Sequence, residues 1–156
     1  MQLYLLRHAD AEPHADNDEM RALTDKGKRQ AVSVGRFCLK HDILPEVILS
    51  SPLVRAEQTA RSVAQELGMP KRVQLEQFLR TGMTPESAFS GLEGHWEKAN
   101  LMLVGHEPDF SNLVAVFIGG RAESVHMRKA TLLSVSLQNL KPGAGTIEFL
   151  IPVKCL

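Results

Sequence analysis

The feature that most constrains the fold is the alternation of short apolar runs with longer stretches of helical periodicity. The runs predict strands at 2–6, 46–49, 73–75, 101–104, 133–137 and 146–151. Strands that alternate with helices predict an α/β fold, a three-layer sandwich around a mostly parallel central sheet. Because only a short turn joins the last two runs, at least one strand must be antiparallel.

Capping residues mark where the intervening helices begin. Thr24 is expected to cap a helix that runs to about Lys40. Ser51 is expected to cap a second helix with Pro52 as its first residue, and Asp109 to cap a later one. Another helix is expected to open at 84–86. Once these elements are placed, little room remains between the second and fourth predicted strands for a large inserted cap domain.

Size and charge exclude several classes of protein. A chain of 156 residues fits one domain spanning 1–156. Its 18 basic and 18 acidic residues cancel, which argues against a broad nucleic-acid or membrane partner surface. The apolar run Leu3–Leu6 is too short to target or span a membrane. Cys38 and Cys155 are expected to be reduced thiols, which favours a cytoplasmic protein.

Three polar clusters follow three of the predicted strands. They are Arg7-His8, the segment 50–60, and Gly105-His106-Glu107. Ligands bind at the carboxyl ends of strands in open α/β sheets, so these clusters are expected to converge on one pocket. Taken singly, each residue also fits a surface or structural role. The three clusters together favour a functional site.

These residue types suit phosphoryl transfer. Arginines offer planar, permanently charged donors to phosphate oxygens. A neutral imidazole can attack phosphorus, and a second one, protonated beside the phosphate, can stabilise its charge. No spacing of histidine, cysteine or acidic residues is typical of a metal site, so neither a metal nor another cofactor is expected.

The clusters also carry a family resemblance. Leu6-Arg7-His8-Ala9 resembles the signature of the histidine phosphatase superfamily, the segment 55–60 is similar to its second motif, and Val104-Gly105-His106 to its third. Within that superfamily the chain resembles the SixA-type phosphohistidine phosphatases in its small size. It also shares their segment 21–24 and the turn 105–108.

The resemblance implies a role for each matching residue. His8 would be the nucleophile that becomes phosphorylated, and Arg7, Arg55 and His106 would complete a phosphate-binding site. Arg21 would reach the phosphate from its loop, although a solvated loop arginine is an equal alternative.

The proton donor is the main departure from the family pattern. Many relatives carry an inserted cap and a carboxylate just past the third strand. Here Glu76 and Glu107 are the candidates, and either also fits a polar strand-end or loop residue. An imidazole departs from phosphorus with less help than an alcohol does. A site without a cap or a strong acid therefore suits phosphohistidine on a protein.

Three functions remain open from the sequence. The first is a metal-independent phosphatase acting on a phosphorylated protein of the histidine phosphotransfer domain type. The second is a phosphatase for a small phosphorylated metabolite. The third is a regulatory module that binds phosphate without catalysis, against which His8 argues because binding alone needs no nucleophile.

Overall fold

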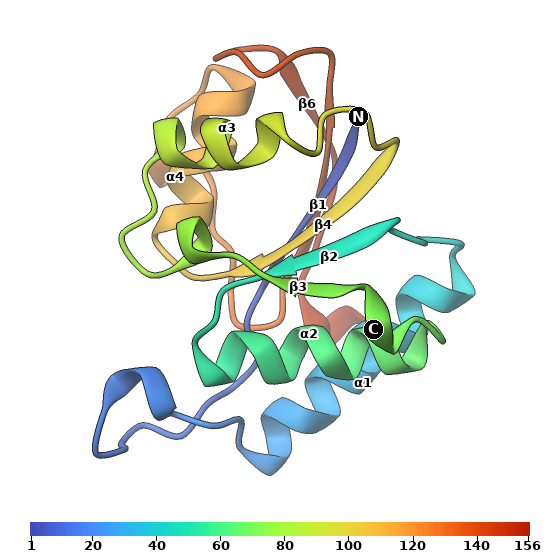
Figure 1. The fold of residues 1–156 in the computed structure, drawn as a ribbon, viewed down its shortest axis with the longest axis vertical. Coiled ribbons are helices and arrows are strands. Elements are labelled where there is room, and N and C mark those ends of the chain that lie inside the picture. The colour runs from blue at the N-terminus through green and yellow to red at the C-terminus, as the bar shows by residue number, and fades with distance from the viewer.

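A six-stranded sheet forms the centre of the protein (Figure 1), as described by a computed structural model of residues 1–156. The strand order is β3-β2-β4-β1-β5-β6. The strands are β1 (Gln2–Arg7), β2 (Val47–Ser50), β3 (Val73–Leu75), β4 (Asn100–Gly105), β5 (Leu132–Leu137) and β6 (Gly145–Ile151). All six lie within one or two residues of the predicted runs.

Strand direction follows the prediction of a mostly parallel sheet. β1 pairs in parallel with β4, and β2 pairs in parallel with both β3 and β4. β5 is antiparallel to β1 and to β6. The short turn between β5 and β6 requires that these two strands run in opposite directions. The carboxyl ends of β1, β2 and β4 therefore lie together at one edge of the sheet.

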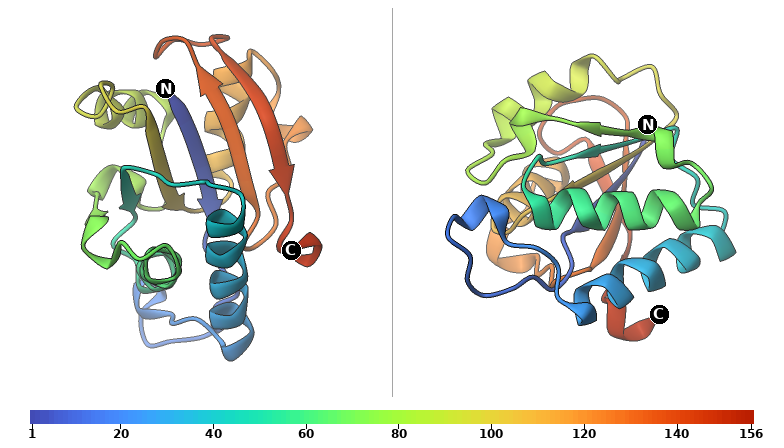
Figure 2. Two further views of the ribbon diagram at one scale, coloured as in Figure 1. Left: turned by 90° about the vertical axis from the view of Figure 1, so that its right-hand side faces the viewer. Right: turned by 60° about the horizontal axis from the view of Figure 1, so that its bottom comes forward.

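Two pairs of helices cover the two faces of the sheet (Figure 2). On one face lie α1 (Asp25–Lys40) and α2 (Val54–Glu66); on the other lie α3 (Pro85–Glu93) and α4 (Asp109–Ile118). Alternate residues of β1 point to opposite faces, so Leu5 packs in the α3–α4 layer and Leu6 in the α1–α2 layer. The prediction of a three-layer α/β sandwich is confirmed.

The interior of β4 explains its continuous apolar sequence. Leu101 and Leu103 pack on one side, while Met102 and Val104 pack on the other. All four side chains are fully buried. A strand in the middle of a sheet with helices on both faces has no solvated side, so each of these four residues is apolar.

Two of the predicted helix starts are confirmed. The Thr24 hydroxyl accepts a hydrogen bond from the Gly27 N–H at the start of α1. Thr84 caps α3, where it forms reciprocal hydrogen bonds with Ser87.

The predictions for Ser51, Pro52 and Asp109 are wrong. α2 begins at Val54 after Leu53, so neither Ser51 nor Pro52 belongs to its first turn. Asp109 is the first residue of α4, and its carboxylate accepts hydrogen bonds from the N–H groups of Gly82 and Met83. Both polar side chains have tertiary partners that compete with local capping.

No inserted cap covers the edge where β1, β2 and β4 end. Between α2 and β4 the chain forms only β3, two single-turn helices and α3.

Both cysteines are free thiols, Cys38 buried and Cys155 exposed. None of the helices combines the length and the apolar character that crossing a bilayer requires.

Candidate active site

The three polar clusters meet at the carboxyl edge of the sheet. Arg7 lies opposite Gly105 in the β1–β4 register, and Ser50 lies opposite Val104 in the β2–β4 register. The His8 N–H also donates to the Gly105 carbonyl over 3.0 Å. Residues that follow three separate strands are thereby held side by side.

Two buried imidazoles form the centre of this site. The ring centroids of His8 and His106 lie 5.3 Å apart, with an angle of 55° between the ring planes. The two side chains are 6% and 2% exposed, respectively. At this distance and angle the two rings are not stacked, and both can contact one small group bound beside them.

The environment of His8 suits a nucleophile. Its Nδ1 lies 2.8 Å from the Ala9 carbonyl oxygen, which can only accept, so Nδ1 carries the proton. Nε2 then holds the free lone pair. Burial, with smaller contributions from Arg55 and Arg7, lowers the pKa of His8 to about 4. At neutral pH the ring is therefore uncharged and able to attack phosphorus.

His106 is held by a residue that follows the neighbouring strand β2. Its Nε2 lies 2.8 Å from the Ser51 hydroxyl, and its buried Nδ1 has no partner. Burial, followed by the charges of His8 and Arg55, lowers the pKa of His106 to about 3. In the free site the ring of His106 is therefore uncharged at neutral pH. A bound phosphate dianion would favour protonation of His106.

Arg7 and Arg55 supply the positive charge. Arg55 is 3% exposed in the first turn of α2, and its Nη1 donates to the Asp18 carbonyl over 2.8 Å. The Nη1 of Arg7 donates to the Met127 carbonyl over 2.9 Å. Burial lowers the pKa of both groups, but guanidinium ions remain charged in proteins.

Unpartnered donors concentrate in this site. Four buried side-chain atoms in the protein lack a hydrogen-bond partner, and three of them are Arg7 Nε, Arg55 Nε and His106 Nδ1. Leaving a buried donor unpaired costs about 1–3 kcal/mol. Phosphate oxygens would give these nitrogens acceptors, so the arrangement fits a tetrahedral oxyanion.

Arg21 reaches the site through an acidic neighbour. Its Nε lies 2.7 Å from Oδ1 of Asp18, whose Oδ2 lies 3.2 Å from Nη2 of Arg55. Arg21 also contributes to lowering the pKa of His8. The short helix of residues 18–20 thus brings Arg21 into the electrostatic environment of the site, although Arg21 stays partly exposed.

The sequence did not identify three residues that hold the site together. They are Asp18, Ser51 and Thr59. The Thr59 hydroxyl accepts from the Ala9 N–H over 3.1 Å and donates to the Arg55 carbonyl over 2.7 Å. The contacts from Thr59 to Ala9, from Ser51 to His106 and from Asp18 to Arg55 join distant parts of the chain, so no local sequence pattern predicts them.

Glu107 and Glu76 differ in their relation to the site. Glu107 is half-buried, interacts electrostatically with Arg7, and accepts a hydrogen bond from the Ser111 hydroxyl over 2.8 Å. Burial raises the pKa of its carboxyl above the usual range. Glu76 follows β3, where its N–H donates to the Ser50 carbonyl. Glu107 thus combines a position near Arg7 with a carboxyl whose pKa is raised by burial.

Comparison with known proteins assigns the chain to a family. The family model of the histidine phosphatase superfamily (branch 1) matches residues 3–83. The chain belongs to this superfamily. An uncharacterised protein of Picosynechococcus is 34% identical over 95% of this chain and 89% of its own length. The phosphohistidine phosphatase SixA of Escherichia coli is 28% identical over 96% and 92%.

Solved structures agree with this assignment. A protein histidine phosphatase SixA solved with tungstate superposes with a TM-score of 0.90 at 25% identity, covering 99% of this chain and 98% of that one. The chain is therefore a phosphatase of the SixA type. No cluster of three or more histidine, cysteine or acidic residues in the structure could hold a metal ion.

Proposed function

We propose that this protein removes the phosphoryl group from phosphohistidine on another protein, through a phosphorylated His8. The observation that carries the proposal is the state of His8. Its proton is fixed on Nδ1 by the Ala9 carbonyl, and burial keeps the ring uncharged. A binding module would gain nothing from a buried neutral nucleophile, which argues against the non-catalytic alternative.

The chemistry follows from the positions of the groups. Nε2 of His8 attacks phosphorus, the phosphorus–nitrogen bond of the substrate breaks, and the substrate ring, already protonated on its other nitrogen, leaves as neutral imidazole. Water then attacks phospho-His8, which releases inorganic phosphate and restores the neutral ring. Arg7, Arg55 and His106 bind the phosphoryl oxygens, where fixed charges and donors stabilise the transition state.

A protein substrate fits the open site. No cap encloses the phosphoryl group, so little of this chain could grip the remainder of a small molecule. A protein can contribute binding energy through surface contacts outside the pocket. The SixA of Escherichia coli, a relative over nearly the whole chain, is named a phosphohistidine phosphatase.

Free thiols such as that of Cys38 also suit a cytoplasmic location.

Glu107 supports a second candidate function. A small phosphorylated alcohol needs a general acid to protonate its leaving oxygen. The half-buried Glu107, with its raised pKa, could supply that proton beside Arg7. A phosphatase for a small phosphorylated metabolite is therefore the alternative.

A direct comparison of substrates tests the proposal. We expect kcat/KM for a phosphorylated histidine phosphotransfer domain to exceed that for sugar phosphates or phosphoglycerate by about tenfold or more, at one pH and salt concentration. Comparable or higher values for a metabolite would favour the alternative. They would leave the phospho-His8 mechanism in place.

A further inference from the structure

A strongly basic pocket adjoins the candidate active site. It has a volume of about 370 Å³, and of its nine lining residues five are basic and one is acidic: Arg7, Lys26, Arg128, Lys129, Lys154 and Asp10. The whole chain has no formal net charge, so this positive charge is a property of one face. Lys26, Arg128, Lys129 and Lys154 are all exposed, and we call these four residues the basic rim.

The basic rim lies at the same edge of the sheet as His8. Lys26 is in the first turn of α1, Arg128 and Lys129 precede β5, and Lys154 follows β6. The N–H of Ala130 donates to the carbonyls of both Arg7 and His8. The loop that carries two of the rim cations is thus hydrogen-bonded to the backbone of the nucleophile. The C-terminal turn lies beside α1 (Figure 2). Lys154 on this turn and Lys26 on α1 therefore line the same pocket.

Most of the rim charge is free to meet a partner. Lys129 pairs with Asp10, with 2.6 Å between Nζ and Oδ1. Lys26, Arg128 and Lys154 form no ion pair with any carboxylate of this chain. Unpaired, exposed cations at the mouth of a site attract a negatively charged partner and orient it during encounter.

The distribution of these cations fits a protein surface better than a small anion. A small phosphorylated ligand is usually held by buried, bidentate guanidinium groups. The basic rim instead consists of exposed side chains on three separate segments. We propose that it docks an acidic surface patch next to the phosphohistidine of the substrate protein. This inference rests on the proposed function, which it extends from the phosphoryl group to the protein that carries it.

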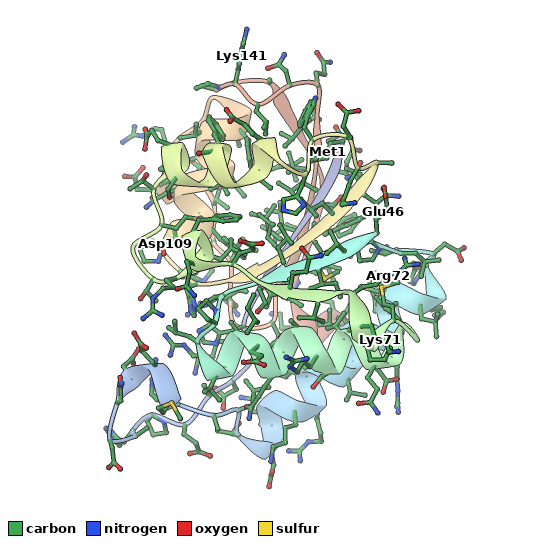
Figure 3. The ribbon with its side chains drawn as sticks, viewed as in Figure 1. Met1, Glu46, Lys71, Arg72, Asp109 and Lys141 are labelled. Carbon is green, nitrogen blue, oxygen red and sulfur yellow. The ribbon has the colours of Figure 1, made fainter.

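Charge reversal at the unpaired cations tests the docking. The triple variant Lys26→Glu/Arg128→Glu/Lys154→Glu leaves Arg7 and the Lys129–Asp10 pair unchanged. A matched control, Lys71→Glu/Arg72→Glu/Lys141→Glu, changes the same residue types and the same net charge. These three control residues are exposed and lie elsewhere (Figure 3), Lys71 and Arg72 beyond the end of α2 and Lys141 at the opposite end of the sheet.

Two substrates separate docking from chemistry. One is a phosphorylated histidine phosphotransfer domain with acidic residues around its histidine, and the other is phosphoramidate, which has no surface to dock. For the rim variant we expect kcat/KM to fall about tenfold or more with the protein at about 50 mM salt. The loss should shrink to about threefold or less at about 0.5 M salt, because ions screen exposed charges. With phosphoramidate the rim variant should stay within about twofold of wild type.

Each other outcome overturns the docking. Unchanged turnover of the phosphoprotein by the rim variant would refute it and leave the proposed function standing. An equal loss with phosphoramidate would assign these cations to phosphate binding or to the fold, and an equal loss in the control would assign the effect to net charge. If the wild type turns over no phosphohistidine protein, the proposed function fails, and the docking fails with it.

Discussion

Replacing Ser51 with alanine tests whether the orientation of His106 matters for turnover. The Ser51 hydroxyl lies 2.8 Å from Nε2 of His106, and both side chains are buried. If the hydroxyl donates to Nε2, the ring proton stays on Nδ1, the unpartnered nitrogen that would face a phosphate oxygen. Ser51 is thus a positioning residue that acts through His106.

The structure sets the size of the expected effect. Without the hydroxyl, Nε2 of His106 becomes a buried group with no partner, and the Leu53 N–H loses its acceptor at 3.3 Å. A buried unpaired group costs about 1–3 kcal/mol. Because about 1.4 kcal/mol corresponds to a tenfold change in rate, we expect kcat to fall about fivefold to a hundredfold if the bond acts in the transition state.

A neighbouring serine provides the control. Ser50 is also fully buried, but its hydroxyl donates to the Ser51 carbonyl over 2.9 Å and not to His106. The assay compares kcat for phosphoramidate and denaturant unfolding for Ser51→Ala, Ser50→Ala and wild type. Ser50→Ala should lose stability but keep kcat within about threefold. Similar kcat values for the two variants, whether both are retained or both are lost, would refute the positioning role.

Two further predictions follow from the pKa values of buried groups. Because the folded pKa of His8 is lowered to about 4, the unfolded chain takes up a proton first as pH falls, so stability present above pH 6.5 is lost below it. This should contribute about 2 kcal/mol between pH 6.5 and 5, seen as a steeper loss of unfolding free energy in wild type than in His8→Asn. Glu107→Gln should lower kcat on an alkyl phosphate about a hundredfold but change turnover of phosphohistidine protein by less than about threefold, while Glu76→Gln affects neither. Equal effects of Glu107→Gln on both substrates would contradict its role as a leaving-group acid.

Local sequence rules predicted the layers of this fold well. A run of continuous apolar residues predicts a buried strand such as β4, and a capping residue such as Thr24 predicts the start of a helix. The strand order could not be predicted, since β4 inserts between β1 and β2 through pairing of distant segments. The carboxyl-end rule for α/β sheets nevertheless indicated that residues after β1, β2 and β4 would meet.

Local sequence rules could not predict the residues that support the site, such as Ser51 and Asp18. Ser51 has the sequence context of a helix cap, but its hydroxyl meets His106, which is 55 positions away along the chain. Asp18 stands in an acidic loop, and only the folded chain shows that it bridges Arg21 and Arg55. Tertiary hydrogen bonds override local propensity at both positions, and a sequence without its fold does not reveal such partners.

The central claim is that His8 carries the phosphoryl group during turnover. The most direct test is rapid quenching of the wild-type enzyme with a radiolabelled phosphohistidine protein, followed by separation from the donor and mapping of the labelled peptide. We predict an acid-labile, alkali-stable phosphate on His8, and loss of both label and turnover in a folded His8→Ala variant. Near-normal turnover by His8→Ala, or label on any other residue, would contradict the account.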